Sequence, residues 1–455
     1  MPTVKHEMSR LISLTWPLLV AQVTQTLMGV SDTIMAGRFS AVDMAAVAIG
    51  FSITIPILCF VQGLAMAIPP IVSKLQGADK SHQIANATQQ AFYLILPISF
   101  VIMAMNFFVE YWFSLIDMES ELRRITVEYV QYILYATPAF AAYQILRNYC
   151  EGLSNTKPTM VIMVVGLMVN IPANYILIYG KLGLPALGGV GCGIATALVY
   201  LAMLVTTAIY VGLSKRMQVF NLYQNLVQPH WLQIKATFWL GIPIALTILF
   251  EVTLFGVVAL LLSPLGPLTV ASHQITLNFS ALMFMFPLSI GMATTIRVGY
   301  CLGKEDIKGA ALAAKTAIFL GLAIAMFTAL ITVLAREQIA LLYSSDSQVI
   351  ELAVSLMFLA AMFQLSDAVQ AISAGALRGY KDTRAMFIIT FFAYWAIGLP
   401  TGVILALTDW LTPALGAKGF WIGFICGLTS AAIMLGLRLK HIQKKCLFSQ
   451  ARHDA

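Results

Sequence analysis

A short stretch of this chain occurs twice, once in each half. The residues Pro-Ala-Leu-Gly at 185–188 recur at 413–416, 228 positions later. An offset of 226 likewise relates Pro17 to Pro243. Two near-equal halves that share their proline and glycine positions predict two similarly folded bundles, an arrangement typical of membrane transporters.

The composition indicates a membrane protein. Apolar residues make up 60% of the 455 residues, charged residues only 10%, and the mean hydropathy is +0.85. A soluble protein of this length needs more charge to cover its surface. The six cysteines show no C-x-x-C spacing, so neither a zinc site nor a disulfide framework is indicated.

Twelve apolar runs are long enough to cross a bilayer core of about 30 Å as helices. They are centred near 11–36, 44–72, 90–115, 126–150, 159–180, 188–213, 237–263, 268–298, 310–335, 347–376, 385–408 and 415–438. We therefore expect an all-α polytopic fold with two six-helix lobes. The predicted parts are an N-terminal lobe at 1–213, a cytoplasmic linker at 214–236, a C-terminal lobe at 237–440 and a cytoplasmic tail at 441–455. Because six is even, the repeat is parallel, with its pseudo-twofold axis along the membrane normal.

The basic residues predict the orientation. If both termini are inside, six of the 27 Lys and Arg residues fall in outer segments, Arg147 lies inside the fourth run, and the other twenty lie inside. The outer six are Arg38, Arg123, Arg124, Lys181, Arg336 and Lys418. Such a bias predicts that both termini are cytoplasmic. It also accounts for the net charge of +7 without nucleic-acid binding, which needs a basic face interleaved with aromatic residues.

Three carboxylates lie deep within the apolar runs, where an ionisable group is a functional candidate by default. The first, Asp32, follows Gln22, Gln25 and Gly29 at helical spacing, so these residues form one polar stripe. A polar stripe on an apolar helix must face a partner or a water-filled cavity.

Polar residues of two other runs are candidate partners of Asp32. Asn170 and Asn174 are one turn apart in the fifth run, and Thr196 lies in the sixth. Together they offer donors and acceptors around the carboxylate. An interhelical hydrogen-bond cluster with a purely structural role is the alternative.

The other two carboxylates lie in the second half. Glu251 has hydrocarbon side chains on both sides, and burial disfavours its charged form unless a cation neutralises it. Asp367 has Gln364 and Gln370 one turn away on either side. Two carboxylates in one dry pocket suit a hard cation with oxygen ligands or a shared proton. A structural role is the alternative for either, and spacing alone does not decide whether the two meet.

Other charged residues have simpler interpretations. Arg147 and Glu151 are one turn apart and predict an intrahelical ion pair. Arg297 begins an inner loop and is expected to extend to the membrane surface as an anchor. His273 is either a proton partner or a core histidine with its hydrogen bonds satisfied, and we favour the second.

Enzymatic function has little support in the sequence. No nucleophile–base arrangement, Walker sequence or dinucleotide fingerprint occurs. Without a P-loop, ATP is not expected as a direct energy source, and no cofactor is expected. The run 283–286, Met-Phe-Met-Phe, is a candidate lining for an adaptable cavity, although methionine packing between helices explains most of it.

The sequence resembles the multidrug and toxic compound extrusion family, specifically its bacterial NorM-like branch, along nearly its whole length. The matching segments are 28–37, 169–172, 188–193, 250–255, 273–279, 367–370 and 377–382. Close relatives are expected to carry a tyrosine one turn before Asp367, where this chain has Phe363. Any role that the family gives to that hydroxyl is therefore in question here.

The resemblance implies a monomeric, two-lobed antiporter. It would export cationic amphipathic compounds in exchange for Na⁺ or H⁺, and the sequence leaves both coupling ions open. It assigns Asp32, Asn170, Asn174 and Thr196 to a cation or proton site in the N-terminal lobe. It assigns Glu251 and Asp367 to a cation site in the C-terminal lobe. The expected substrate-cavity residues are Gln25, Phe255, Met283, Met285, Phe363 and Gln364.

Two other functions fit the same sequence less well. A flippase for a lipid-linked glycan keeps the architecture but needs a strongly cationic cavity to hold pyrophosphate, and the charges at mid-membrane are mostly acidic. A membrane-embedded enzyme needs convergent polar groups beside a nucleophile or a metal, and no such set is recognisable.

Overall fold

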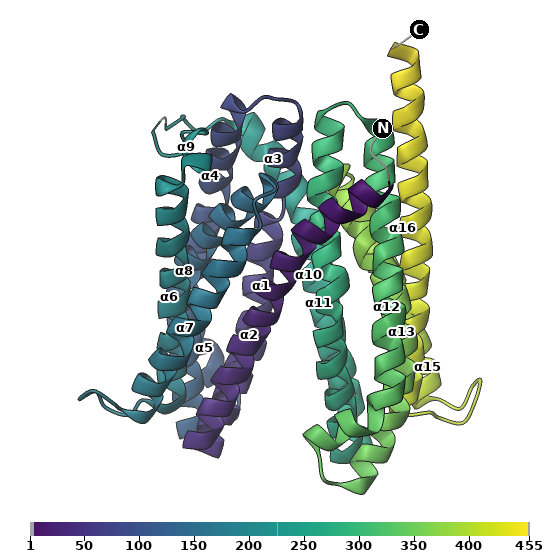
Figure 1. Cartoon of the computed structure of the whole chain (residues 1–455). Helices are drawn as coiled ribbons and strands as arrows, with labels where there is room; N and C mark the ends of the chain where they lie inside the picture. The colour runs from purple at the N-terminus through teal and green to yellow at the C-terminus, as the bar shows by residue number, and fades with distance from the viewer. Residues whose placement is uncertain (1–3, 225, 454–455) are drawn as a thin grey trace. The chain divides into compact units, whose positions relative to one another are not determined.

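The computed structural model describes residues 4–224 and 226–453, with side chains up to residue 448, and every regular element among them is a helix (Figure 1). The start of the predicted N-terminal lobe (1–3), residue 225 of the predicted linker and the end of the predicted tail (454–455) lie outside the described residues. The all-α fold expected from the sequence is confirmed.

The helices of the first half follow one another with short connections. They are α1 (Val4–Phe39), α2 (Ala41–Ala65), α3 (Ile68–Gly77), α4 (His82–Ala104), α5 (Asn106–Ser114), α6 (Ser120–Gly152), α7 (Lys157–Tyr179), α8 (Gly188–Leu213) and the single turn α9 (Lys215–Gln218).

The second half follows the same order. Its helices are α10 (Trp231–Leu262), the 3₁₀ turn η1 (Ser263–Leu265), α11 (Pro267–Gly303), α12 (Ile307–Tyr343), α13 (Ser347–Gly379), α14 (Thr383–Phe391), the π-helical segment η2 (Phe392–Gly398), α15 (Leu399–Leu407) and α16 (Ala417–His453).

The chain forms two compact units. The N-terminal unit comprises residues 20–245, and the C-terminal unit comprises residues 1–19 and 246–455. The boundaries within α1 and α10 each fall two residues after the repeated prolines Pro17 and Pro243, where the missing N–H removes one helical hydrogen bond. The units differ from the lobes drawn from the repeat because the first turns of α1 belong with the second half.

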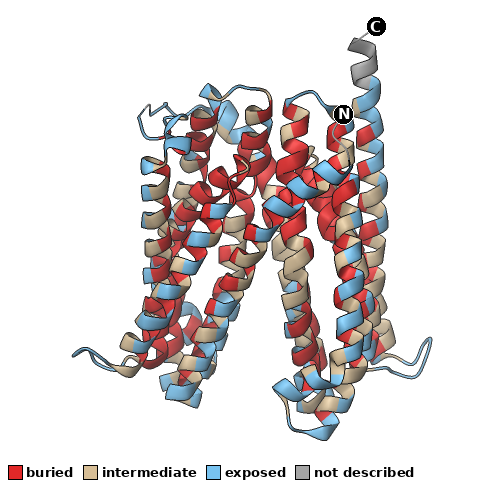
Figure 2. Ribbon diagram, viewed as in Figure 1, coloured by how far each residue is buried: buried red, intermediate tan, exposed pale blue. Residues whose placement is uncertain are grey.

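Each unit is built around one central helix. In the N-terminal unit α6 packs against α2, α4 and α8, and in the C-terminal unit α13 packs against α11, α12 and α16. The buried residues concentrate on these shared helix faces (Figure 2). Both central helices carry polar residues deep in the protein because neighbouring helices, rather than lipid, cover them.

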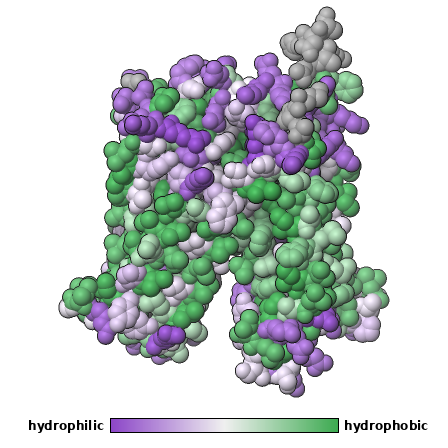
Figure 3. Space-filling view, viewed as in Figure 1, coloured by the Kyte–Doolittle hydropathy of each residue, from purple (hydrophilic) through white to green (hydrophobic). Residues whose placement is uncertain are grey.

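Eleven helical segments among the described residues are long and apolar enough to cross a membrane. The twelfth predicted span, 126–150, corresponds to α6, which has 33 residues but is less apolar. A central helix covered by protein needs a less apolar surface than one that faces lipid. Within each unit the middle of the helices is mostly hydrophobic, and hydrophilic residues gather at the helix ends (Figure 3).

The backbone repeats as the sequence does. Three pairs of residues with left-handed φ occur at matching positions, with φ between 55° and 62°. They are Asp79 with Glu305, Ser154 with Lys381, and Gly188 with Gly416. The offsets are 226, 227 and 228 residues, so the two halves turn the chain in the same way at the same places.

Gly191 and Gly419, three residues after each Pro-Ala-Leu-Gly segment, make the same close helix contact in the two units. A Cβ on Gly191 would lie 2.7 Å from the backbone of Leu177, and one on Gly419 would lie 2.6 Å from the backbone of Leu405. Leu177 and Leu405 are themselves 228 positions apart. The repeated glycines therefore allow α8 to approach α7 and α16 to approach α15.

Gly419→Ala is expected to lower stability, because its methyl group forces α15 and α16 apart. Overpacking of this kind costs about 1–3 kcal/mol. The matched control is Gly436→Ala in the same helix, where a Cβ meets nothing within 4 Å and helix propensity favours alanine by roughly 1 kcal/mol. Thermal unfolding of the purified protein in detergent measures both. Equal unfolding temperatures for the two variants would contradict the packing argument.

Candidate functional site

Three polar side chains of the N-terminal unit surround Asp32; we call Asp32, Asn170, Asn174 and Thr196 the Asp32 cluster. Asn170 on α7 donates from Nδ2 to Asp32 Oδ1 at 2.8 Å, and Asn174, one turn later, donates to the same oxygen at 2.6 Å. Thr196 on α8 lies 3.4 Å from Asp32 Oδ2. The predicted partners of Asp32 therefore meet; Asp32, Asn170 and Asn174 are buried, and Thr196 is partly accessible.

The Asp32 cluster retains unused oxygen acceptors. Asn170 Oδ1 and Asn174 Oδ1 are buried and have no hydrogen-bond partner among the described residues. Thr196 donates its hydroxyl proton at shorter range, 3.0 Å, to the carbonyl of Cys192, which leaves Asp32 Oδ2 weakly bonded. Buried oxygens without donors are costly, and they are also the ligands that a hard cation or an added proton requires.

Two tyrosines near this cluster were not found from the sequence. Tyr129 on α6 and Tyr200 on α8 are within electrostatic range of Asp32. Tyr129 is buried against the backbone of α8, since a Cβ on Gly193 would meet it at 3.1 Å. The glycine-rich start of α8 was the available signal, because small residues there allow the backbone of α6 to approach closely.

The polar residues along one face of α1 contact two different helices, α6 through Gln22 and α7 through Asp32. While Asp32 faces Asn170 and Asn174, Gln22 accepts a hydrogen bond from Nη2 of the buried Arg147 at 3.1 Å. Arg147 Nε in turn pairs with Glu151 at 2.7 Å, as the one-turn spacing predicts. Gln25 is half-buried and makes no hydrogen bond within the described part of the chain.

The C-terminal unit holds a second cluster, which we call the Glu251 cluster: Glu251, Asp367, Arg378 and Tyr394. The two carboxylates, on α10 and α13, interact electrostatically, and Arg378 interacts with Glu251. The Tyr394 hydroxyl, from η2, is within range of both carboxylates. Asp367, Arg378 and Tyr394 are buried, and Glu251 is partly accessible.

The sequence counts Arg378 among the inner cations, and the structure adds that its side chain is buried. The structure places it in the last turn of α13 with 6% of its surface exposed. Its equivalent in the first half at an offset of 227 is Glu151, which is also buried. The repeat therefore held the signal for burial, although the sign of the charge is reversed.

The glutamines beside Asp367 also keep unused acceptors. Gln364 donates from Nε2 to Thr332 Oγ1 at 3.0 Å, which orients the amide. Gln364 Oε1 and Gln370 Oε1 are buried without a hydrogen-bond partner among the described residues. Both units thus place carboxylates near amide oxygens with free lone pairs.

Phe363 lies in an aromatic cluster rather than beside a cation. Its ring meets Trp421 edge-on at 5.8 Å and Phe424 at 6.4 Å, and Phe255 packs on Phe424 at 5.2 Å. His273 is fully buried in the same region, and its Nδ1 accepts a hydrogen bond from Trp421 Nε1 at 3.2 Å. Phe363 packs against aromatic rings here, which suits a phenylalanine without the hydroxyl of the tyrosine expected in close relatives.

The two methionines expected in the substrate cavity both lie on α11. Met283 packs against a separate apolar cluster that includes Ile275 and Phe279. Met285 is half-buried and its carbonyl accepts a hydrogen bond from Ser289. The predicted cavity residues are therefore distributed over several packing clusters.

Arg297 does not extend to the membrane surface as expected. It is buried, and its Nε and Nη2 each donate to Glu7 at 2.8 Å. The partner lies 290 residues away in the chain, on the first turns of α1. Spacing within one helix therefore gave no signal for this ion pair.

A sequence profile described as MatE matches residues 17–176 and, a second time, residues 243–404. The chain belongs to the MatE family. The two matches begin 226 residues apart and end 228 residues apart, the same offsets that relate the prolines and the Pro-Ala-Leu-Gly segments. The resemblance on which the sequence analysis relied is thereby confirmed.

Relatives in this family cover almost the whole chain. Multidrug resistance protein MdtK of Yersinia pseudotuberculosis is 51% identical over 440 residues, 96% of each chain. Probable multidrug resistance protein NorM of Shewanella oneidensis is 52% identical over 444 residues, 97% of each. Both are named as resistance proteins rather than enzymes.

Solved structures of MatE-family transporters share the fold. The eukaryotic MATE transporter AtDTX14 matches with a TM-score of 0.87 at 22% identity and covers 97% of this chain and 98% of its own. An outward-facing multidrug resistance MATE transporter matches with a TM-score of 0.88 at 20% identity, covering 97% and 96%. At these identities the likeness concerns architecture.

Proposed function

We propose that this MatE-family protein is a secondary multidrug exporter. It moves cationic amphipathic compounds out of the cell in exchange for Na⁺ or H⁺. The names of the relatives at 51% and 52% identity support multidrug export. The single observation that carries the coupling is that Asp32, Glu251 and Asp367 lie on candidate spanning helices, with two donor-less amide oxygens on the partners of Asp32.

The two clusters differ in what they offer a coupling ion. In the Asp32 cluster a carboxylate and two unused amide oxygens give a small cation several oxygen ligands, and a proton on Asp32 Oδ2 would turn that oxygen into a donor. In the Glu251 cluster two neighbouring carboxyl groups and one arginine lie together, so one Na⁺ or one proton can be shared between the carboxyl groups.

Alternating access needs an ion whose affinity differs between the two facing states. Occupancy alone moves no equilibrium, since a ligand shifts conformations only by its differential affinity. Entry of the ion into either cluster would favour one state, and binding of the drug would favour the other. Neutralising a buried charge lowers the free energy of the state in which helices exclude water from it, and the ion therefore binds the two facing states with different affinity.

The orientation and assembly belong to the same proposal. The bias of twenty inner against six outer cations supports cytoplasmic termini in a bacterial inner membrane. The working unit is a monomer that needs the lipid bilayer, small cationic drugs and the coupling ion, and no nucleic acid or cofactor.

Proteoliposomes test the proposal directly. Vesicles are loaded with ethidium, a cationic amphipathic probe, and receive an inward gradient of either Na⁺ or H⁺, one at a time. Export should accelerate about tenfold or more under at least one gradient relative to vesicles without a gradient, and ATP should have no effect. Protein-free vesicles are the control for leakage. Ethidium movement that responds to neither gradient would contradict coupled export.

A further inference from the structure

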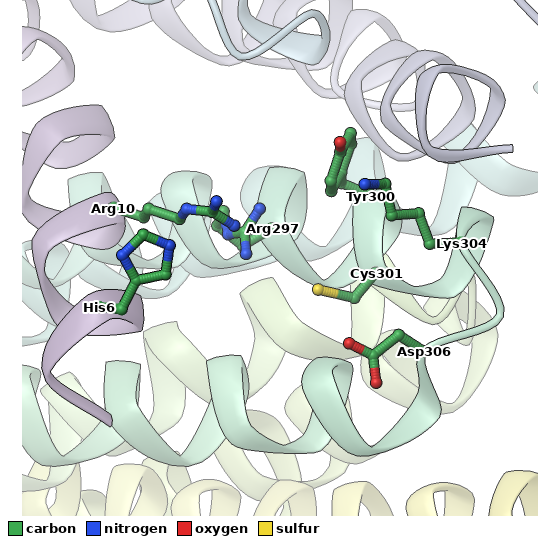
Figure 4. A pocket seen from close by; sticks show the side chains of 7 residues that line it. All are labelled: His6, Arg10, Arg297, Tyr300, Cys301, Lys304 and Asp306. Atoms are coloured by element: carbon green, nitrogen blue, oxygen red, sulfur yellow. The ribbon is translucent and has the colours of Figure 1, made fainter. Parts of the chain in front are cut away.

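A basic pocket lies in the C-terminal unit where α1 begins and α11 ends. Its volume is about 330 Å³, within the range of small-ligand sites. It is lined by His6, Arg10, Arg297, Tyr300, Cys301, Lys304 and Asp306. Figure 4 shows His6 and Arg10 on α1 facing Arg297 on α11, with Tyr300 and Lys304 further along. None of these residues belongs to the two carboxylate clusters.

The pocket carries more positive charge than its acidic groups balance. Arg10 and Lys304 form no ion pair with any described residue. Arg297 is held in place by Glu7, and Tyr300 lies between its guanidinium at 5.5 Å and the Lys304 ammonium at 5.0 Å. These contacts fix two cations before any ligand arrives.

The one acidic lining residue already has a structural partner. Asp306 is the N-cap of α12, and its Oδ1 accepts a hydrogen bond from the N–H of Gly309 at 2.8 Å. Its negative charge is directed at the positive end of the α12 dipole. Arg10 and Lys304 are left to attract an anion.

The repeat shows that these residues are not part of the shared scaffold. At the offset of 226, Arg297 corresponds to Ile71, Arg10 to Ala236, and Lys304 to Ala78. The same offset places Leu232 at the position of His6 and Gln233 at that of Glu7. The equivalent positions of the repeat therefore lack the counterparts of Arg10, Arg297 and Lys304, although Lys74 and Lys80 stand at the positions of Tyr300 and Asp306.

The pocket lies at the depth of lipid headgroups. With 37 residues, α11 is about 55 Å long, whereas a bilayer with its headgroups measures roughly 40–45 Å. The last turns of α11 and the first turns of α1 therefore reach the polar layer. Basic pockets between helices at this depth suit phosphate headgroups.

We propose that this pocket binds the phosphodiester headgroup of an anionic phospholipid. Arg10 and Lys304 pair with the phosphate, and the Glu7-anchored Arg297 directs its remaining N–H donors at the same group. The membrane presents such headgroups at high local concentration beside the pocket, which favours a lipid over dissolved phosphate. This site is separate from the export mechanism and does not depend on which ion drives it.

Native mass spectrometry of the full-length protein tests the assignment. Phosphatidylglycerol is titrated onto the detergent-purified protein beside zwitterionic phosphatidylcholine, and the double variant Arg10→Gln/Lys304→Gln is compared with the unaltered chain. We expect the unaltered chain to prefer phosphatidylglycerol and the double variant to bind it about tenfold more weakly. Raising the ionic strength should weaken binding to the unaltered chain.

A matched control removes two cations from the corresponding part of the other half. Lys74 and Lys80 are exposed and lie at the repeat positions of Tyr300 and Asp306. Lys74→Gln/Lys80→Gln should bind phosphatidylglycerol within about twofold of the unaltered chain. Thermal unfolding of both double variants checks that the fold is intact. The single variant Lys304→Glu reverses one charge of the pocket and should also weaken phosphatidylglycerol binding.

Three results would overturn the proposal. One is equal phosphatidylglycerol binding by Arg10→Gln/Lys304→Gln and the unaltered chain. Another is equal loss in the Lys74/Lys80 control, which would indicate general charge attraction. The last is displacement of the lipid by glycerol phosphate or inorganic phosphate at matching concentration, which would identify a soluble anion as the ligand.

Discussion

Glu251→Gln and Asp367→Asn should each reduce ion-driven ethidium export in proteoliposomes about tenfold or more. An amide neither takes up a proton at neutral pH nor balances a bound cation, so the ion loses its differential affinity for the two facing states. A tenfold loss corresponds to about 1.4 kcal/mol of coupling free energy. Asp32→Asn should act in the same way, because its carboxylate accepts from both Asn170 and Asn174.

The controls for this experiment separate coupling from folding. Glu251→Asp keeps a carboxylate near Arg378 and should retain part of the ion-driven export. Glu337→Gln removes an exposed carboxylate at the end of α12 and should leave export unchanged. Binding of ethidium without a gradient should persist in all variants that fold. Full ion-driven exchange in Asp32→Asn, Glu251→Gln and Asp367→Asn together would refute the coupling mechanism.

The features that were predictable from the sequence are those that helix geometry encodes locally. A spacing of three and four residues puts Gln22 and Asp32 on one stripe, and one turn separates Arg147 from Glu151. Repeated prolines and glycines give the two-fold plan, because a proline or a close helix contact imposes the same backbone in both halves. None of these inferences requires knowledge of which helices are neighbours.

The residues that were missed depend on contacts between distant segments. Arg297 and Glu7 are 290 positions apart, and Tyr394 reaches the carboxylates from a π-helical segment. That segment runs into Pro400, whose missing N–H leaves the preceding carbonyls without a regular partner. The sequence alone does not say which helices pack against each other. A buried cation near a loop therefore has the same sequence pattern as a cation that anchors a helix at the membrane surface.

The candidate site residues of this chain lie where its two halves differ. Asp32 corresponds to Val258, Glu251 to Gln25, and Arg297 to Ile71. The repeated positions, such as Gly191 and Gly419, hold helices together. Under the proposed function, the shared scaffold would let two similar bundles change conformation in related ways, while the unshared polar residues would give each bundle its own ligand.

Glu7→Gln is expected to destabilise the protein by about 3–5 kcal/mol, because it leaves the Arg297 guanidinium buried without a counter-charge. Both side chains are almost inaccessible, 7% for Arg297 and 1% for Glu7, and two hydrogen bonds of 2.8 Å join them. Thermal unfolding in detergent measures the loss.

The double variant Glu7→Gln/Arg297→Met shows whether the unpaired charge causes that loss. Replacing both members of a buried pair by uncharged groups avoids the desolvation cost, so the double variant should unfold at a clearly higher temperature than Glu7→Gln alone. The matched control is Glu128→Gln, which breaks an exposed pair with Arg124 and should change stability by less than about 1 kcal/mol. If Glu7→Gln were as mild as Glu128→Gln, the ion pair would not anchor the start of α1 to α11. Rescue by Arg297→Met would instead show that Glu7 stabilises the fold by neutralising the buried charge of Arg297.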